Sequence, residues 1–299
     1  MTRPVPPWAA TLAIIGALLM GVPLVALMLR VPWLDVPRLL VSPAAVDALW
    51  LSLRTCLAST VLCLLLGLPL ALALSRLRGR WMAIGRVLAT VPMVLPPVVA
   101  GLALLVTFGR RGLIGQVLSL GGIEIGFTTI AVVISQTFVA MPFLVVAVEG
   151  ALRSVDGDAE LMAATLGAGP SRVLWQVTVP ALRPAIVSGT SLAAARALGE
   201  FGATVTFAGS LQGTTRTLPL EIYLQREVDT DTSLALAAVL IGLAALLVLA
   251  TGVLGRSGAA RSGGVGSEGT SGNSGAARSG GAASASSRNG RPGGTGGAA

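Results

Sequence analysis

The stretch Leu57-Ala-Ser-Thr-Val-Leu-Cys-Leu-Leu-Leu-Gly-Leu-Pro-Leu-Ala-Leu-Ala-Leu74 contains 18 consecutive residues without a charged side chain. As a helix such a run approaches the length needed to cross a bilayer core of about 30 Å, because each residue rises about 1.5 Å. It lies within a longer apolar block, residues 46–75, whose helix would exceed the core and must tilt or begin outside the membrane. The stretch therefore predicts a membrane-spanning chain.

Composition supports this prediction. The 299 residues are 54% hydrophobic and 11% charged, whereas soluble domains carry about 25% charged residues. The apolar block at residues 8–29 could be read as a signal peptide, but no A-x-A cleavage pattern precedes Arg30, so we expect a retained helix. We predict an all-α polytopic membrane protein with six transmembrane helices in one bundle, the other blocks being roughly 8–29, 83–108, 127–150, 184–208 and 234–254.

The distribution of arginine predicts the orientation. Every basic residue is Arg, and most lie at Arg3, in the connections 76–86 and 153–183, and after residue 254. The positive-inside rule then predicts a multi-pass protein of the plasma (inner) membrane with both termini in the cytoplasm. This topology accounts for the net charge of +8 without nucleic acid as a partner.

Three regions follow from the same pattern. We expect residues 1–45 to form the N-terminal transmembrane helix and an external loop and residues 46–254 to form the main membrane domain, whereas residues 255–299 are almost wholly Gly, Ser, Ala and Arg. A segment of that composition has too few apolar residues for a core. We expect it to be a disordered cytoplasmic tail.

The residue inventory excludes several kinds of chemistry. There is no His, and the two cysteines, Cys56 and Cys63, lie roughly 10 Å apart on one helix, too far for a disulfide. We expect both cysteines to be packing residues, and we expect neither a catalytic residue nor a bound metal or cofactor. A phosphate-binding loop of the Walker type needs a Lys, which the chain lacks, so any ATP must be bound by another subunit.

The connection at residues 154–180 predicts two short helices. Asp156 or Asp158 can cap the first helix, and Gly167 suits the position just past its end. Pro170 suits the first turn of the second helix, which we expect to stop before Pro180. Two interpretations remain open: the first helix plugs into the groove of a partner, or it packs on its own bundle. Its apolar face consists of Leu161, Met162, Thr165 and Leu166.

This connection resembles the cytoplasmic loop of the permease subunits of binding-protein-dependent ABC importers. That loop reads Glu-Ala-Ala, three residues, Gly, nine residues, then Ile-x-Leu-Pro; here Gly167 is followed after nine residues by Val177-Thr-Val-Pro180. Leu161 occupies the usual Glu position and Met162 the first Ala position, with Glu160 immediately before them. The resemblance implies docking on a cytoplasmic ABC ATPase by a coupling loop of Glu160, Leu161, Met162, Ala163, Ala164, Gly167 and Ala168.

The resemblance extends over about 200 residues and includes Leu51-Ser-Leu-Arg54 and Gly67-Leu-Pro69. Ala195-Arg-Ala-Leu-Gly-Glu-Phe-Gly-Ala-Thr204 and Thr215-Arg-Thr-Leu-Pro219 are most similar to the molybdate branch, with sulfate and thiosulfate permeases second. The resemblance implies a type I importer permease fold with its coupling helix between transmembrane helices 4 and 5. It also implies a homodimer, an external molybdate-binding protein and a partner subunit that uses ATP. Tungstate and sulfate remain alternative substrates.

Charged and hydroxyl residues in the fifth block have two interpretations each. Arg196 and Glu200 either neutralise one another, being four residues apart, or Glu200 shapes the pathway. Thr204 and its small neighbours either allow close helix packing or line the pathway. In the third block, Pro92, Pro96 and Pro97 break the regular hydrogen-bond ladder, so the helix must kink or unwind, as a static kink or as the hinge of a gate.

Two other functional classes are weaker. An intramembrane enzyme would need a general base, but the chain has neither His nor Lys and no pair of intramembrane Asp residues. A passive channel or proton-coupled carrier would not need the two-helix cytoplasmic loop. The sequence therefore favours a transport subunit over an enzyme.

Overall fold

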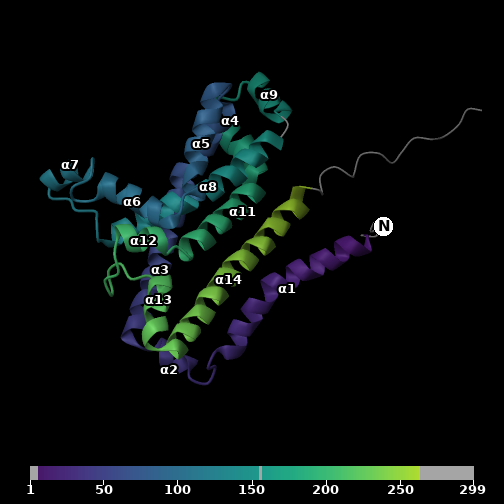
Figure 1. Cartoon of the computed structure of the whole chain (residues 1–299). Coiled ribbons are helices and arrows are strands. Elements are labelled where there is room, and N and C mark those ends of the chain that lie inside the picture. Colours follow the sequence, from purple (N-terminus) through teal and green to yellow (C-terminus); the bar gives the residue numbers. More distant parts are fainter. Residues whose placement is uncertain (1–5, 155–156, 263–299) are drawn as a thin grey trace, which may run out of the picture.

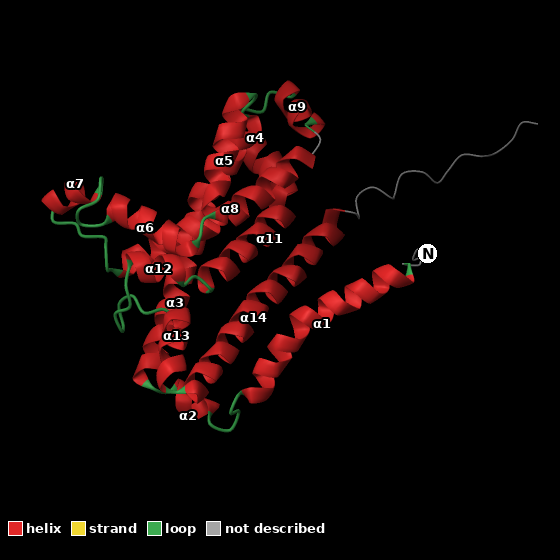
Figure 2. Cartoon of the chain, viewed as in Figure 1, coloured by secondary structure: helices red, strands yellow, loops and turns green. Residues whose placement is uncertain are grey.

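The computed structural model describes residues 6–154 and 157–262, with residues 251–262 described by their backbone alone. Those ranges contain helices and no strand (Figure 2). In chain order the helices are α1 (Pro7–Arg30), α2 (Val36–Leu40), α3 (Pro43–Leu62), the π-helical turn η1 (Cys63–Gly67), α4 (Leu68–Arg76), α5 (Arg80–Val94), α6 (Pro97–Phe108), α7 (Gly115–Leu120), α8 (Thr129–Ser154), α9 (Asp158–Thr165), α10 (Pro170–Val173), the π-helical turn η2 (Leu174–Thr178), α11 (Val179–Leu198), α12 (Gly202–Phe207), α13 (Leu218–Val228) and α14 (Thr230–Ser262).

Four helical segments in the described ranges have the length and hydropathy of a membrane span: α1, the continuous α3–η1–α4 segment, α8 and the first part of α14. The pair α5 and α6 adds a fifth if it is counted as one span, although the chain bends by 115° between the two helices. The fifth apolar block is divided between α11, which carries Arg183 and Arg196, and the short α12. The all-helical membrane fold is confirmed.

Helices α8 and α11 form the centre of the bundle, and α3, α4 and α14 pack around them (Figure 1). Their shared core includes Leu144 and Val148 of α8 with Leu182 and Leu198 of α11, all buried. Helix α1 packs against α14, and none of its residues is buried. Its exposed apolar side chains suit contact with lipid, because lipid tails are as apolar as these side chains.

Each π-helical turn comes directly before a helix whose second residue is proline. Pro69 follows η1 and Pro180 follows η2. The prediction that the helix stops before Pro180 is wrong: α10, η2 and α11 run on from Pro170 to Leu198. In η2 the Val179 N–H donates to the Leu174 carbonyl, five residues earlier. This wider turn accommodates proline, which lacks an N–H and clashes with the preceding turn of an α-helix.

The two ends of the described chain complete the fold. Helix α14 begins at a polar cap, where Thr232 Oγ1 and the Asp231 N–H donate to the Asp229 carboxylate. These bonds hold the pKa of the Asp229 carboxyl below its usual value. Helix α14 continues to Ser262, past the start of the segment expected as a tail, and the remaining tail residues 263–299 lie outside the described residues. Cys56 and Cys63 are free and buried, as expected of packing residues.

Candidate functional site

Helix α9 is closed at its C-terminus by a glycine motif. Gly167 has a φ of +84°. The Ala168 N–H donates to the Ala163 carbonyl and the Gly167 N–H to the Ala164 carbonyl, both at 3.0 Å. This pair of bonds is a Schellman motif, which needs a left-handed residue and therefore favours glycine. Gly167 thus stands where the sequence predicts it.

The start of α9 differs from the expectation. Gly157 occupies the N-cap, and Asp158 lies inside the first turn without making a capping bond. The predicted cap by Asp158 is therefore wrong, and Asp156 lies outside the described residues. Asp158 and Glu160 still place acidic groups in the first turn, where they suit the positive end of the helix dipole.

A hydrogen bond of Glu160 connects α9 to the bundle. Its carboxylate accepts a hydrogen bond from the hydroxyl of Thr178, a buried residue of η2. Leu161, Met162 and Leu166 are instead exposed, at 65%, 66% and 88%. Helix α9 is therefore held through its acidic side and presents an apolar surface outward. This surface lies at one end of the bundle, opposite α2 and α13 (Figure 1).

Ion pairs near this end of the bundle join α5 to α8. The carboxylate of Glu149, a buried residue, lies 2.7 Å from Arg86 Nη2 and 2.9 Å from Arg153 Nη2. Glu149 was not predicted from the sequence. The available signal was its position near the end of an apolar block, four residues before Arg153.

We predict that Glu149→Ala lowers the free energy of unfolding by about 1–2 kcal/mol, because Arg86 and Arg153 lose a charge-assisted hydrogen-bond partner. The loss is no larger because both arginines are partly exposed and water screens their charges. The control is Glu124→Ala, since the Glu124–Arg110 pair is 2.7 Å long but exposed on both sides. Thermal unfolding of the purified protein in detergent measures both variants. Equal shifts would contradict the structural role of Glu149.

The residues predicted in the fifth block meet at the break between α11 and α12. Arg196 Nη1 lies 2.6 Å from Glu200 Oε2, and Glu200 Oε1 accepts a 2.8 Å hydrogen bond from the Ala203 N–H. The ion pair is confirmed, and Glu200 also caps α12, a role the sequence did not reveal. Thr204 is fully buried, and its hydroxyl has no hydrogen-bond partner in the described part of the chain.

Helix α12 packs against α6 through glycines. A Cβ on Gly101 would lie 2.7 Å from the Ala203 carbonyl oxygen, and one on Gly202 would lie 2.5 Å from Pro97 Cβ. Pro96 precedes α6 and Pro97 is its first residue, at the 115° bend. The structure therefore brings the Pro96–Pro97 bend together with the segment that holds Glu200 and Thr204. The coupling-loop residues lie apart from this junction, at the end of the bundle (Figure 1).

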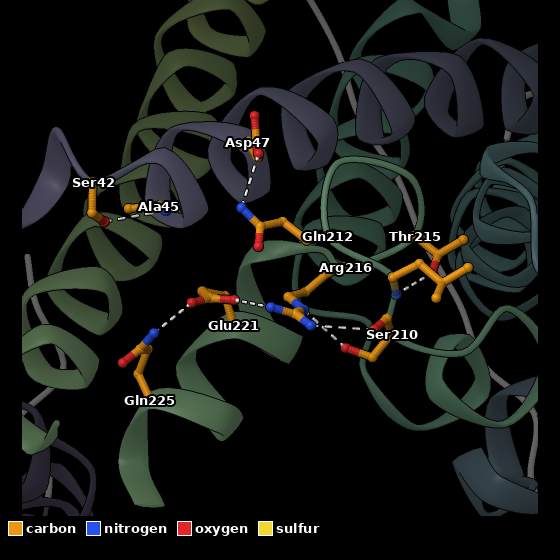
Figure 3. Close-up of polar contacts among 10 residues, drawn as sticks. Ser42, Ala45, Asp47, Ser210, Gln212, Thr215, Arg216, Glu221 and Gln225 are labelled. Carbon is orange, nitrogen blue, oxygen red and sulfur yellow. Dashed lines mark hydrogen bonds and ion pairs between the residues drawn. The ribbon is translucent and has the colours of Figure 1, made fainter. Parts of the chain in front are cut away.

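A polar network at the opposite end was not predicted. Figure 3 shows Arg216 between Ser210 and Glu221, with Arg216 Nη1 3.4 Å from Glu221 Oε2. Gln225 Nε2 donates to the other oxygen of Glu221 at 2.7 Å. Gln212 crosses to Asp47 at the start of α3. Only the spacing of Glu221 and Gln225, four residues apart on α13, was a sequence signal.

No group of three His, Cys, Asp or Glu residues suited to a metal occurs in the described ranges.

Residues 64–256 match the family described as binding-protein-dependent transport system inner membrane component. The chain belongs to this family. As a member it is a multi-pass inner-membrane permease, a transport subunit rather than an enzyme.

Curated relatives of this permease family include the molybdenum transport system permease protein ModB of Mycobacterium tuberculosis, 55% identical over 247 residues that cover 83% of this chain and 94% of that protein. The sulfate transport system permease protein CysW of Synechococcus elongatus is 36% identical over 68% of this chain and 71% of its own length. A solved bacterial ABC transporter for alginate has the same fold, with a TM-score of 0.63, 18% identity, and coverage of 84% of this chain and 94% of that chain.

Proposed function

We propose that this permease imports molybdate in an ATP-driven system. The observation that carries the proposal is the 55% identity to a molybdenum permease over 247 residues. The sulfate permease CysW is 36% identical to this chain over a smaller share of it, so sulfate is the second candidate, with tungstate an alternative of the same shape.

The apolar surface of α9 is proposed as the docking surface for a separate ATPase. Leu161, Met162 and Leu166 are exposed together on a short helix, and such a helix fits a groove on a partner. The proposed coupling loop comprises these residues with Glu160, Ala163, Ala164, Gly167 and Ala168. Because Glu160 anchors α9 to η2 through Thr178, a movement of the ATPase would be transmitted to α11.

A gate is proposed at the junction of α6 and α12. Close packing of Gly101 against Ala203 and of Gly202 against Pro97 makes the two short helices move together. The breaks at Pro96 and at Glu200 supply the hinges. The buried hydroxyl of Thr204, which has no hydrogen-bond partner among the described residues, is a group that a rearrangement of α12 could pair. In this proposal Glu200 holds the start of α12 and does not bind the anion, because two negative charges repel.

We propose six membrane crossings, counting α5–α6 and α11–α12 as one broken span each, with both termini and α9 in the cytoplasm. The arginine distribution supports this orientation. In Figure 1 the N-terminal end of α1 and the far end of α14 both point away from α2 and α13, which supports a common side for the termini. An external binding protein would then approach the end that carries Arg216, and two copies of the chain would enclose the pathway.

The proposed orientation predicts the accessibility of introduced cysteines. In a chain with Cys56 and Cys63 replaced by Ala, Thr2→Cys and Gly157→Cys should react with a membrane-impermeant maleimide in inside-out vesicles. Gln212→Cys should react only in vesicles of the opposite orientation. Labelling of positions 2 and 212 from the same side would contradict the six-crossing topology.

Uptake into vesicles tests the proposed import. Proteoliposomes that contain this chain, its ATPase and its binding protein should accumulate labelled molybdate when ATP is enclosed, and should not do so when ATP is replaced by ADP. Equal accumulation with ATP and ADP would contradict an ATP-driven importer and favour a passive channel.

A further inference from the structure

A shallow cavity lies between α4 and α10, at the end of the bundle that carries α9. Its walls are Leu72, Ala73 and Leu174, with Arg76 and Ser171 among the polar lining residues, and its volume is about 300 Å³. Arg76 also lines a second cavity, beneath α9. The cavity therefore combines apolar walls with a guanidinium at the point where an apolar helix ends.

The charge of Arg76 is not neutralised by a described carboxylate. Arg86 and Arg153 share Glu149, whereas no ion pair joins Arg76 to an acid within residues 6–154 and 157–262. Glu160 lines the neighbouring cavity, but its carboxylate accepts the hydrogen bond of Thr178. Arg76 is thus a cation with capacity for an external anion.

An exposed apolar stripe leads from the cavity along the helix. Leu65, Pro69, Ala73 and Arg76 are all exposed, and their spacings of four, four and three residues place them near one face of the η1–α4 segment. The stripe runs about 16 Å from Leu65 to Arg76, at about 1.5 Å per residue. An acyl chain could lie along that length while its phosphate meets the arginine.

We propose that Arg76, with Ser171, binds the phosphate of an anionic phospholipid whose acyl chain lies along Leu65, Pro69 and Ala73. Basic pockets between transmembrane helices on the cytoplasmic side suit such headgroups, because the cytoplasmic leaflet carries the anionic lipid. This assignment rests on the orientation in the proposed function. The bound lipid would join α4 to α10, directly beside the coupling loop.

Photolabelling tests this site in the full chain assembled with its ATPase. Two vesicle preparations contain phosphatidylglycerol or phosphatidylcholine with the same photoactivatable acyl chain, and mass spectrometry quantifies the label in residues 65–76 and 170–175. We expect about fivefold more label from phosphatidylglycerol, the preference that one arginine near the surface confers. Arg76→Gln should remove this preference, whereas Arg76→Lys should keep most of it.

Arg78→Gln is the matched control, since Arg78 is exposed on the same connection but lines neither cavity. It should label as the unaltered protein does. Equal labelling by the two lipids, an unchanged preference in Arg76→Gln, or no label in either segment because the ATPase or a second copy covers it would each overturn the proposal. Labelling needs neither ATP nor molybdate, so its failure is distinguishable from a failure of import.

Discussion

Gly167→Val should reduce ATP-dependent uptake by at least about fivefold while ATP hydrolysis by the assembled transporter continues. The cause is conformational, because Gly167 has a φ of +84° and nothing lies within 4 Å of a Cβ built there. A β-branched residue at this φ is strained by on the order of 1–3 kcal/mol, and 1–3 kcal/mol corresponds to about 5–150-fold in a coupling equilibrium. The end of α9 would then open and loosen the proposed contact with the ATPase.

Two variants separate this strain from simple bulk. Gly167→Asn should retain most uptake, since Asn adopts the left-handed conformation more readily than other residues with a side chain. Gly169→Val should also be tolerated by the chain, because Gly169 has a φ of −67° and open space around it. If Gly167→Val transports normally at normal expression, the coupling role of this end of α9 is wrong.

Gly101→Ala should abolish most transport and destabilise the protein by about 1–3 kcal/mol, the usual range for overpacking. The added methyl would lie 2.7 Å from the Ala203 carbonyl oxygen and 2.7 Å from Thr206 Cβ. Because one of these neighbours is backbone, relief requires α6 and α12 to separate. The gain from replacing Gly by Ala in a helix, about 0.5–1 kcal/mol, is too small to offset the clash.

The matched control is Gly242→Ala in α14, where a Cβ meets nothing within 4 Å. It should transport normally and show equal or greater thermal stability. Uptake and the unfolding temperature of Gly101→Ala are measured together. Lower stability with unchanged uptake per folded molecule would leave the packing correct but contradict a gate at this junction.

Continuous apolar runs made much of the fold predictable. Helices α1 and α8 correspond closely to blocks in the sequence, because about 20 apolar residues favour a helix in lipid whatever surrounds them. The Pro96–Pro97 pair also predicted a break, but its angle of 115° depends on the packing of α6 against α12. That packing joins residues about 100 positions apart, which no local pattern reveals.

The errors have local physical causes. Pro180 was expected to end a helix, but the π-helical turn at residues 174–178 accommodates it, and such a turn has no reliable sequence signal. Gly157 rather than Asp158 caps α9. The role of Glu200 in capping α12 depends on the helix break after Leu198, so spacing alone predicted only its pair with Arg196.

The most direct test of molybdate import is competition in ATP-loaded vesicles that contain the permease, its ATPase and its binding protein. Labelled molybdate should enter in the presence of a large excess of sulfate, because the proposed system recognises the larger anion. Uptake that is abolished by sulfate would contradict molybdate as the substrate and would assign the permease to sulfate import.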